Sequence, residues 1–191
     1  MGPTVDDAVR SLAAGRLVVY PTDTLLGLGA RAGDREAVGR LEAAKGRPSG
    51  QPISVAVSSV PEVEALAELS GPGCRFLRLH LPGPYTVLVR PSPLARRRLV
   101  PRVFAESGTV GLRVPDHPLA RELARRAGPL TATSANYHGA PPCRTLAEAR
   151  RVFGDRVDVY LGSGSSGSGT PSTLVDLTRE EPRTISRPGR P

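Results

Sequence analysis

The stretch "AAKGRPSGQPISVAV", residues 43–57, joins the end of an expected helix to an expected strand through a basic turn. Arg47, Pro48 and Gly50 interrupt the helical pattern, and the run "ISVAV" that follows has the composition of a short buried strand. Lys45 is the only lysine in a chain with 25 arginines. Because ammonium and guanidinium groups differ in shape and hydration, a lysine kept here indicates a need for a compact cation.

The rest of the chain also alternates helices with strands. Thr4 and Asp34 are expected helix caps, Gly15 a helix end and Pro61 a first helical residue. The segment "PTDTLLGLGA" (21–30) is expected to be a loop. The expected helices cover about 4–15, 34–45, 61–69, 73–80, 117–126 and 145–152, and the expected strands 17–20, 53–57, 85–89, 110–114, the start of 129–136, "VDVYL", "STLVDL" and "TISR". This order predicts an α/β fold with a twisted mixed sheet in one domain, 1–191.

Composition narrows the classes of function. The net charge of +8 and pI near 10.6 favour an acidic partner such as a nucleotide or nucleic acid. Cys74 and Cys143 match no zinc spacing, and the three histidines are scattered, so we expect no metal held by protein side chains. No apolar run reaches about 18 residues, and the N-terminus lacks signal-peptide character, so we expect a cytoplasmic protein without membrane contact.

Small hydroxyls, glycines and arginines gather where expected strands meet loops. The segments are "YPTDTLLGLGA", "KGRPSGQPISV", "GLRVPDHP" with "TATSAN", and "GTPSTLVD" with "SRPG". Such groups bind phosphate and carboxylate oxygens, and ligands of open α/β sheets bind at strand ends. Each segment alone also fits a local role, for example Asp23 as a turn cap or Arg113 as a strand residue reaching solvent. Walker and Ser-His-Asp patterns are absent from the sequence. The segments rich in hydroxyls, glycines and arginines therefore predict an oxyanion-binding α/β protein.

Six motifs in order resemble the YrdC-type threonylcarbamoyl-adenylate synthase family: "PTDTLLGLGA", "KGRPSGQPISVAV", "PGPYTVLV", "VGLRVPDHP", "LTATSAN" and "PSTLVDLT…ISRPG". The resemblance covers residues 17–189 and implies a YrdC-like twisted mixed sheet with flanking helices around a large basic cavity. It implies the short, single-domain form of the family. The implied reaction condenses L-threonine, bicarbonate and ATP, with Mg²⁺ on the phosphates, into threonylcarbamoyl-AMP and pyrophosphate. A partner transferase complex would pass the product to tRNA.

Roles for individual residues follow from the same resemblance. It implies that Lys45 and Arg47 are catalytic and contact the ATP phosphates. The further positions implied for ATP are Gln51, Thr109, Asn136 and Arg187, and those implied for L-threonine are Thr24, Arg113, Ser134 and Ser172. The chain departs from many relatives at Leu26 (tyrosine), Ala56 (histidine) and His138 (serine or threonine), which bears on threonine specificity.

Other interpretations remain open at the level of sequence. A non-enzymatic RNA-binding or ribosome-associated protein could use the same basic cavity, with tRNA or double-stranded RNA as its partner, because the chain carries arginine clusters at 96–98 and 125–126. Carbamoyl transfer in hydrogenase maturation is a weaker alternative, since this chain has neither the acylphosphatase-like segment nor the zinc-finger cysteines of those proteins. The segment 161–172 is a candidate lid over a labile product.

Overall fold

A computed structural model describes residues 2–48, 50–162 and 167–185. Its helices are α1 (Val5–Ala13), α2 (Arg35–Lys45), α3 (Val60–Leu66), α4 (Gly71–His80), α5 (Pro93–Arg98), α6 (Pro118–Ala127) and α7 (Leu146–Phe153), with 3₁₀ turns η1 (Pro101–Val103) and η2 (Gly154–Arg156). Its strands are β1 (Val18–Tyr20), β2 (Gly27–Gly29), β3 (Val55–Ala56), β4 (Ala67–Glu68), β5 (Tyr85–Pro91), β6 (Val110–Arg113), β7 (Leu130–Thr131), β8 (Thr133–Ser134), β9 (Val159–Tyr160), β10 (Thr173–Asp176) and β11 (Arg183–Ile185).

Local signals explain most of the helix ends. The Thr4 side chain caps α1 in a reciprocal capping box with Asp7, and Asp34 accepts hydrogen bonds from two amides at the start of α2. Helix α2 ends at Gly46, whose φ of 61° is the left-handed conformation that glycine adopts without strain. The expected helix end before "GRPSG" is therefore confirmed, and it directs the chain from α2 toward β3.

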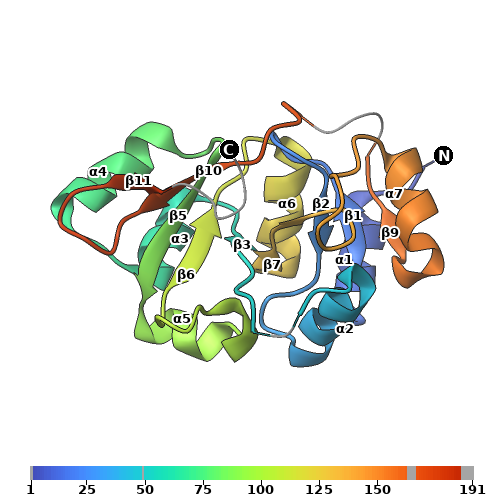
Figure 1. The fold of residues 1–191 in the computed structure, drawn as a ribbon, viewed down its shortest axis with the longest axis horizontal. Helices are drawn as coiled ribbons and strands as arrows, with labels where there is room; N and C mark the ends of the chain where they lie inside the picture. Colours follow the sequence, from blue (N-terminus) through green and yellow to red (C-terminus); the bar gives the residue numbers. More distant parts are fainter. Residues whose placement is uncertain (1, 49, 163–166, 186–191) are drawn as a thin grey trace.

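Two mixed sheets form the framework of the molecule. The smaller has the order β8-β2-β1-β9, and the larger has the order β11-β10-β5-β6-β3-β7, with β4 paired to β5. Both contain parallel and antiparallel pairs, so the predicted mixed α/β architecture is confirmed. Figure 1 shows the larger sheet beside α3, α4 and α5, and the smaller sheet beside α1, α2 and α7.

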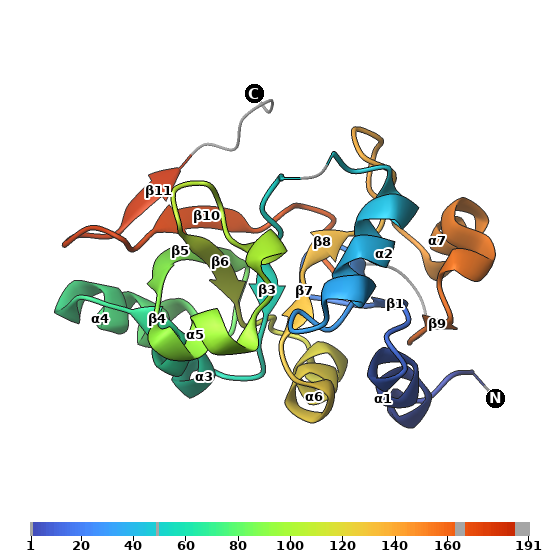
Figure 2. The same cartoon turned by 90° about the horizontal axis from the view of Figure 1, so that it is seen from below.

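Helices cover both faces of the smaller sheet but not both faces of the larger one. Helices α1 and α6 contact each other and enclose one apolar cluster with β1 and β9, whereas α2 and α7 pack apolar residues on the opposite side. Figure 2 shows α1 and α6 below the smaller sheet and α2 above it. In β5 and β6, Val87, Val89 and Leu112 enter the core, and Leu88, Gly111 and Arg113, which alternate with them, line a cavity.

The segment "PTDTLLGLGA" differs from its expected loop structure, because residues 27–29 form β2. Its glycines make room for the ring of Tyr20 on the neighbouring strand. A Cβ atom at Gly27 would lie 2.8 Å from Tyr20 Cζ, and one at Gly29 would lie 2.8 Å from Tyr20 Cε1. Tyr20 is fully buried and its hydroxyl donates to Thr131 O at 3.1 Å, so the ring cannot turn away. These glycines therefore serve packing.

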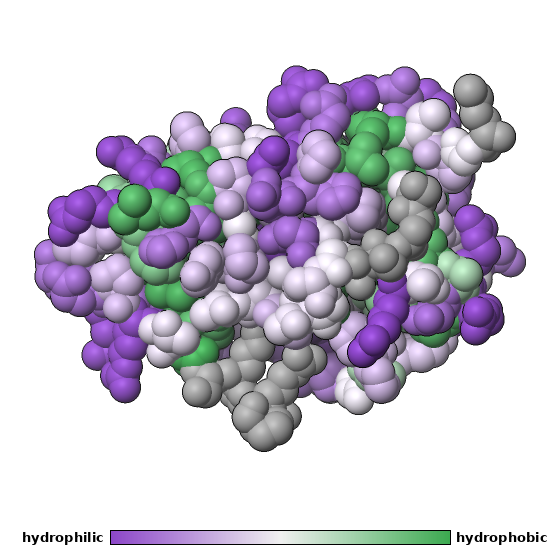
Figure 3. Space-filling view, turned by 90° about the horizontal axis from the view of Figure 1, so that it is seen from above, coloured by the Kyte–Doolittle hydropathy of each residue, from purple (hydrophilic) through white to green (hydrophobic). Residues whose placement is uncertain are grey.

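Strands β4 and β8 and helix α5 are further elements that the sequence pattern did not indicate. Each has six residues or fewer, and Pro93 starts α5 within a run of arginines that carries little apolar periodicity. Hydrophilic residues predominate on the face shown in Figure 3, where apolar residues form separate patches. Among the described residues, no helix combines the length and apolarity needed to cross a membrane.

Candidate active site

A cavity of about 780 Å³ lies between the exposed face of the larger sheet and the edge of the smaller one. Strands β5, β6 and β10 contribute Leu88, Gly111 and Leu174 to its wall. The structure brings together predicted site residues from five separate segments: Thr24, Arg47, Gln51, Thr109, Arg113, Ser134 and Ser172 all line it. The two arginines carry full positive charges into a wall that is otherwise rich in hydroxyls and backbone groups.

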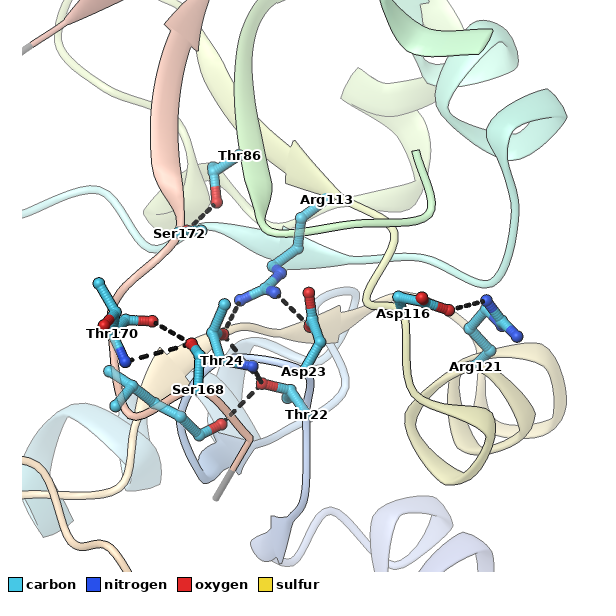
Figure 4. A network of polar contacts seen from close by, with 11 residues as sticks. Thr22, Asp23, Thr24, Thr86, Arg113, Asp116, Arg121, Ser168, Thr170 and Ser172 are labelled. Atoms are coloured by element: carbon cyan, nitrogen blue, oxygen red, sulfur yellow. Dashed lines mark hydrogen bonds and ion pairs between the residues drawn. The ribbon is translucent and has the colours of Figure 1, made fainter. Parts of the chain in front are cut away.

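Arg113 and Thr24 form the inner part of the site. The Arg113 side chain leaves the end of β6, donates from Nη1 to Thr24 Oγ1 at 3.0 Å and from Nη2 to Asp23 Oδ1 at 2.7 Å (Figure 4). Thr22 Oγ1 lies 3.0 Å from Thr24 Oγ1 and accepts from the Thr24 amide at 3.1 Å, which fixes the orientation of Thr24. Burial lowers the pKa of Arg113, and the Asp23 carboxylate opposes that shift. Arg113 is thus held charged and oriented beside the cavity.

A backbone contact fixes the Thr22–Thr24 turn from outside. The amides of Gly167, Ser168 and Gly169 donate to the carbonyls of Thr22, Asp23 and Thr24 at 3.2, 2.9 and 2.9 Å. A Cβ atom at Gly167 would lie 2.1 Å from Asp23 O, so only glycine permits this approach. Residues 167–169 are part of the segment proposed from sequence as a lid, and that role stays a prediction, because residues 163–166 lie outside the described part of the chain.

Ser172 enters the cavity wall at the start of β10. Its hydroxyl lies 2.7 Å from Thr86 Oγ1 of β5, and both side chains are buried (Figure 4). The strands β10 and β5 are parallel neighbours, which places the two hydroxyls at one level of the sheet. Thr86 has no distinguishing local signal in the sequence, so this pairing could not be expected from the motif alone.

Lys45 has a different environment from the one expected for a phosphate-facing residue. Its Nζ donates to Ser134 O at 2.5 Å, to Asn136 O at 2.8 Å and to Asn136 Oδ1 at 3.4 Å. The residue is 3% exposed, and neither Lys45 nor Asn136 is among the residues that line the cavity. Burial lowers the pKa of Lys45 to about 8, and the nearby charge of Arg47 adds to this effect. The ammonium supports the turn behind Ser134.

Asn136 completes that turn. Its Nδ2 donates to the carbonyls of Tyr137 and Ala140 at 2.7 Å each, and its Oδ1 accepts from Ser134 Oγ at 2.5 Å. The "SAN" motif is therefore a turn held by hydrogen bonds within residues 134–140, and it places Ser134 of β8 in the cavity wall. Arg187, the remaining residue implied for ATP, lies outside the described residues.

Arg47 is the second arginine that lines the cavity. Its Nη2 donates to Pro52 O at 2.7 Å, and burial lowers its pKa. Ser107 and Thr109, whose hydroxyls are 3.0 Å apart, line the same cavity from the segment that precedes β6. His138 lies in the wall too, with its amide donating to Lys45 O at 2.8 Å.

Some lining residues were not selected from the sequence. Ser54 and Thr133 belong to the same hydroxyl-rich segments as the selected residues, so that composition could have indicated them. Ser107 lies outside those segments, two residues before Thr109. Tyr20 and Leu88 lie in apolar runs whose pattern indicates ordinary core residues of strands. Of the three departures from the family pattern, Leu26 and His138 line the cavity, whereas Ala56 does not.

The cavity has few groups suited to bind a metal ion directly. Within the described parts of the chain, no cluster of three His, Cys, Asp or Glu side chains could hold one. Arginines and hydroxyls instead suit carboxylate and phosphate oxygens. The fold and site thus define an α/β protein whose cavity is lined by two arginines and several hydroxyls.

Comparison with known proteins gives the family. The sequence model of the Sua5/YciO/YrdC family, described as telomere recombination, matches residues 10–189, and the chain belongs to this family. A Mycobacterium tuberculosis protein is 43% identical over 183 residues, which are 95% of this chain and 82% of that protein. A Pseudomonas putida protein named threonylcarbamoyl-AMP synthase is 35% identical over 188 residues, 97% of each chain.

A solved structure extends the likeness to the whole fold. The crystal structure of Pyrococcus abyssi Sua5 complexed with L-threonine matches with a TM-score of 0.84 and 32% identity. The match covers 95% of this chain and 53% of that protein, so this chain spans about half the length of that relative.

Proposed function

We propose that the protein is a threonylcarbamoyl-AMP synthase, an ATP-dependent nucleotidyltransferase that condenses L-threonine, bicarbonate and ATP. The observation that carries the proposal is the pairing of Arg113 with Thr24 in a cavity that Arg47 also lines. Such a cavity offers one cation for a carboxylate and another for phosphates. Its volume of about 780 Å³ lies within the range of roughly 300–1,000 Å³ usual for ligand sites.

The amino acid would lie at the inner arginine. Arg113 donates from Nη1 to Thr24 and from Nη2 to Asp23, so the plane of its guanidinium group is fixed. Its remaining N–H donors are therefore oriented before a carboxylate binds. The hydroxyls of Ser134 and Ser172 then surround the remainder of the amino acid. Relatives named threonylcarbamoyl-AMP synthase and a relative solved with L-threonine support this assignment.

ATP would lie along the other wall. We assign Arg47, Gln51 and Thr109 to the nucleotide, together with Arg187, and we assign Lys45 and Asn136 an indirect part, because they hold the turn that carries Ser134. Since the described residues provide no carboxylate cluster, Mg²⁺ would be held by the triphosphate and would offset its charge.

The reaction asks for positioning more than for covalent participation by the protein. The threonine amine and bicarbonate give N-carboxythreonine and water. A carboxylate oxygen of that carbamate then attacks the α-phosphorus, the α–β phosphoanhydride bond breaks, and pyrophosphate leaves. Arginines that neutralise the leaving group and hydroxyls that orient the nucleophile can supply the acceleration. The product is a labile mixed anhydride, so exclusion of water favours its yield.

The product implies partners outside this chain. We propose that a transferase complex receives threonylcarbamoyl-AMP for tRNA modification, that contact with tRNA is electrostatic, and that the protein works in the cytoplasm, where ATP and tRNA meet. The alternative of a non-enzymatic RNA-binding protein receives no support from the relatives named above, since the name of the Pseudomonas putida protein states an enzymatic activity.

One measurement tests the reaction class and the substrate together. Pyrophosphate release is followed with ATP and Mg²⁺ across a panel of amino acids, with and without bicarbonate. We expect release only when L-threonine and bicarbonate are both present, with serine as the control for the methyl group. Tight tRNA binding without pyrophosphate release from the complete mixture would overturn the proposal.

A further inference from the structure

Glu42 is a buried carboxylate in the last turn of α2, where the partial negative charge of the helix end disfavours an acid. Its side chain is 5% exposed, and the sequence assigns it no role. A buried carboxylate needs compensating cations, because its desolvation costs several kcal/mol. Its two neighbours of opposite charge are both connected to the cavity.

The first neighbour is Arg102 in η1. Arg102 Nη1 donates to Glu42 Oε2 in an ion pair that joins α2 to the segment before β6. The chain from η1 leads directly to the residues that line the cavity at 105, 107 and 109. Backbone hydrogen bonds from Ala105 N to Thr109 O and from Gly108 N to Ala105 O, each 2.8 Å, make this segment a tight turn. The ion pair therefore sets the position of a compact unit that carries Thr109.

The second neighbour is Arg47, which lines the cavity five residues beyond Glu42. Its amide donates to Glu42 O at 3.0 Å. The negative charge of Glu42 acts against the lowering of the pKa of Arg47 by burial. Glu42 Oε1 and Arg47 Nε are both buried, and neither has a hydrogen-bond partner among the residues that the structure describes. Glu42 Oε1 is a hydrogen-bond acceptor and Arg47 Nε is a donor, and each needs a partner when it is buried.

We propose that Glu42 is a positioning residue for the nucleotide side of the site: its carboxylate fixes the turn that carries Thr109 through Arg102, and its negative charge orients the nearby guanidinium of Arg47 for a phosphate. The inference rests on the proposed synthase activity and adds a residue that acts through others. The proposed role of Glu42 concerns the nucleotide and not the amino acid, because Arg113, Asp23 and Thr24 form a separate hydrogen-bond network at the amino-acid side.

The test compares Glu42→Gln with Glu36→Gln. Glu36 lies on the same helix and pairs with Arg40 at 3.6 Å on the exposed surface, so its variant is a matched control. We expect Glu42→Gln to raise the KM for ATP roughly tenfold, as loss of a charge-assisted contact does, and to leave the KM for threonine within about twofold. Glu36→Gln should leave both constants unchanged.

A double variant guards against loss of folding. In Glu42→Gln/Arg102→Gln, two neutral amides can still hydrogen-bond, so the contact is kept while the charge that supports Arg47 is removed. We expect it to fold and to bind a fluorescent ATP analogue as weakly as Glu42→Gln does. Arg102→Lys in the wild-type background keeps a cation beside Glu42, so we expect it to retain most of the wild-type affinity.

The outcomes separate the inference from the activity on which it rests. Equal increases in both KM values, or a lowered Tm with unchanged KM for ATP, would overturn the role of Glu42 while wild-type turnover persists. Absence of pyrophosphate release from the wild-type protein would instead contradict the synthase proposal. Binding of the ATP analogue, measured without turnover, decides the role of Glu42 in that case: an unchanged affinity in Glu42→Gln overturns it.

Discussion

Lys45 shows at the scale of one residue why an arginine-rich protein keeps a single lysine. Its ammonium fits among Ser134 O, Asn136 O and Asn136 Oδ1, within 3.4 Å of each. A planar guanidinium carries five donors and needs more room than a buried pocket of three oxygens supplies. The partners of this ammonium are protein oxygens, and the need for a compact cation at this position stays a prediction.

The single lysine also permits a direct pH measurement. Because burial lowers the pKa of Lys45 to about 8, the folded protein binds fewer protons than the unfolded chain between about pH 8 and the ordinary lysine value of 10.5. The contribution of Lys45 to the free energy of unfolding therefore rises with pH across this window. Activity should fall over the same window, since a neutral amine holds the Ser134 turn less firmly.

Carbon-13 NMR of the Lys45 Cε can follow this titration without assignment, because the chain has one lysine. We expect a midpoint near 8 that coincides with the alkaline loss of pyrophosphate release. A midpoint near 10.5, or a loss of activity well below the lysine midpoint, would show that another group controls the profile. Wild-type protein in 6 M guanidinium chloride gives the unfolded reference.

The two cavity arginines should differ in which substrate they affect. We expect Arg47→Ala and Arg113→Ala each to abolish detectable product while the far-UV circular dichroism stays unchanged, because removing a charged contact from a reacting oxyanion costs about 10²–10³ in rate. At reduced activity, Arg47→Lys should mainly raise the KM for ATP and Arg113→Lys the KM for threonine. Near-wild-type turnover in either alanine variant would contradict the assignment.

At the scale of elements, β2 depends on glycine for a steric reason. An alanine at Gly27 places its Cβ 2.8 Å from the ring of Tyr20, which is fully buried. We expect Gly27→Ala to lower the free energy of unfolding by about 1–3 kcal/mol through overpacking. Gly39, inside α2, has open space at its Cβ, so Gly39→Ala should raise stability by about 0.5–1 kcal/mol. Urea denaturation measures both, and similar stabilities for the two variants would refute this explanation.

The contact between residues 167–169 and the Thr22–Thr24 turn leads to a prediction about threonine binding. The Cβ of Gly167→Ala would meet the Asp23 carbonyl at 2.1 Å, a backbone atom that cannot move without displacing Thr24. We expect this variant to raise the KM for threonine roughly tenfold with a small change in Tm, since one misplaced contact can cost 10²-fold. Gly169→Ala, with open space at its Cβ but a φ of 73°, separates backbone strain from this clash. An unaltered KM would show that the turn keeps its geometry without residues 167–169.

The whole molecule carries a net charge of +8, more than its small-molecule site accounts for. Arg96, Arg97 and Arg98 are exposed at the end of α5, away from the residues that line the cavity. We expect sequence-independent tRNA binding whose affinity falls as salt rises, with a log–log slope of about −0.9 per phosphate neutralised in a duplex. Replacing the three arginines with glutamine should reduce this slope and leave pyrophosphate release unchanged. A slope near zero in the wild type would exclude this electrostatic contact.

Much of the fold was predictable because it depends on neighbouring residues. Caps at Thr4 and Asp34, the glycine after α2 and the apolar runs of β1, β5 and β6 act within a few residues, so local sequence predicts them. Short elements such as β4 and β8 depend on pairing with distant strands, and sequence patterns do not indicate them.

The α/β class, most helix and strand positions and the hydroxyls and arginines typical of an oxyanion site follow from the amino-acid sequence. Which atoms meet depends on the tertiary fold: Arg113 contacts Asp23 and Thr24, 90 and 89 residues apart, and Lys45 contacts backbone oxygens. The physical reason is that a side chain's charge and donors are set by its type, whereas its burial and partners are set by packing. A backbone carbonyl that accepts from a buried lysine leaves no mark in the sequence.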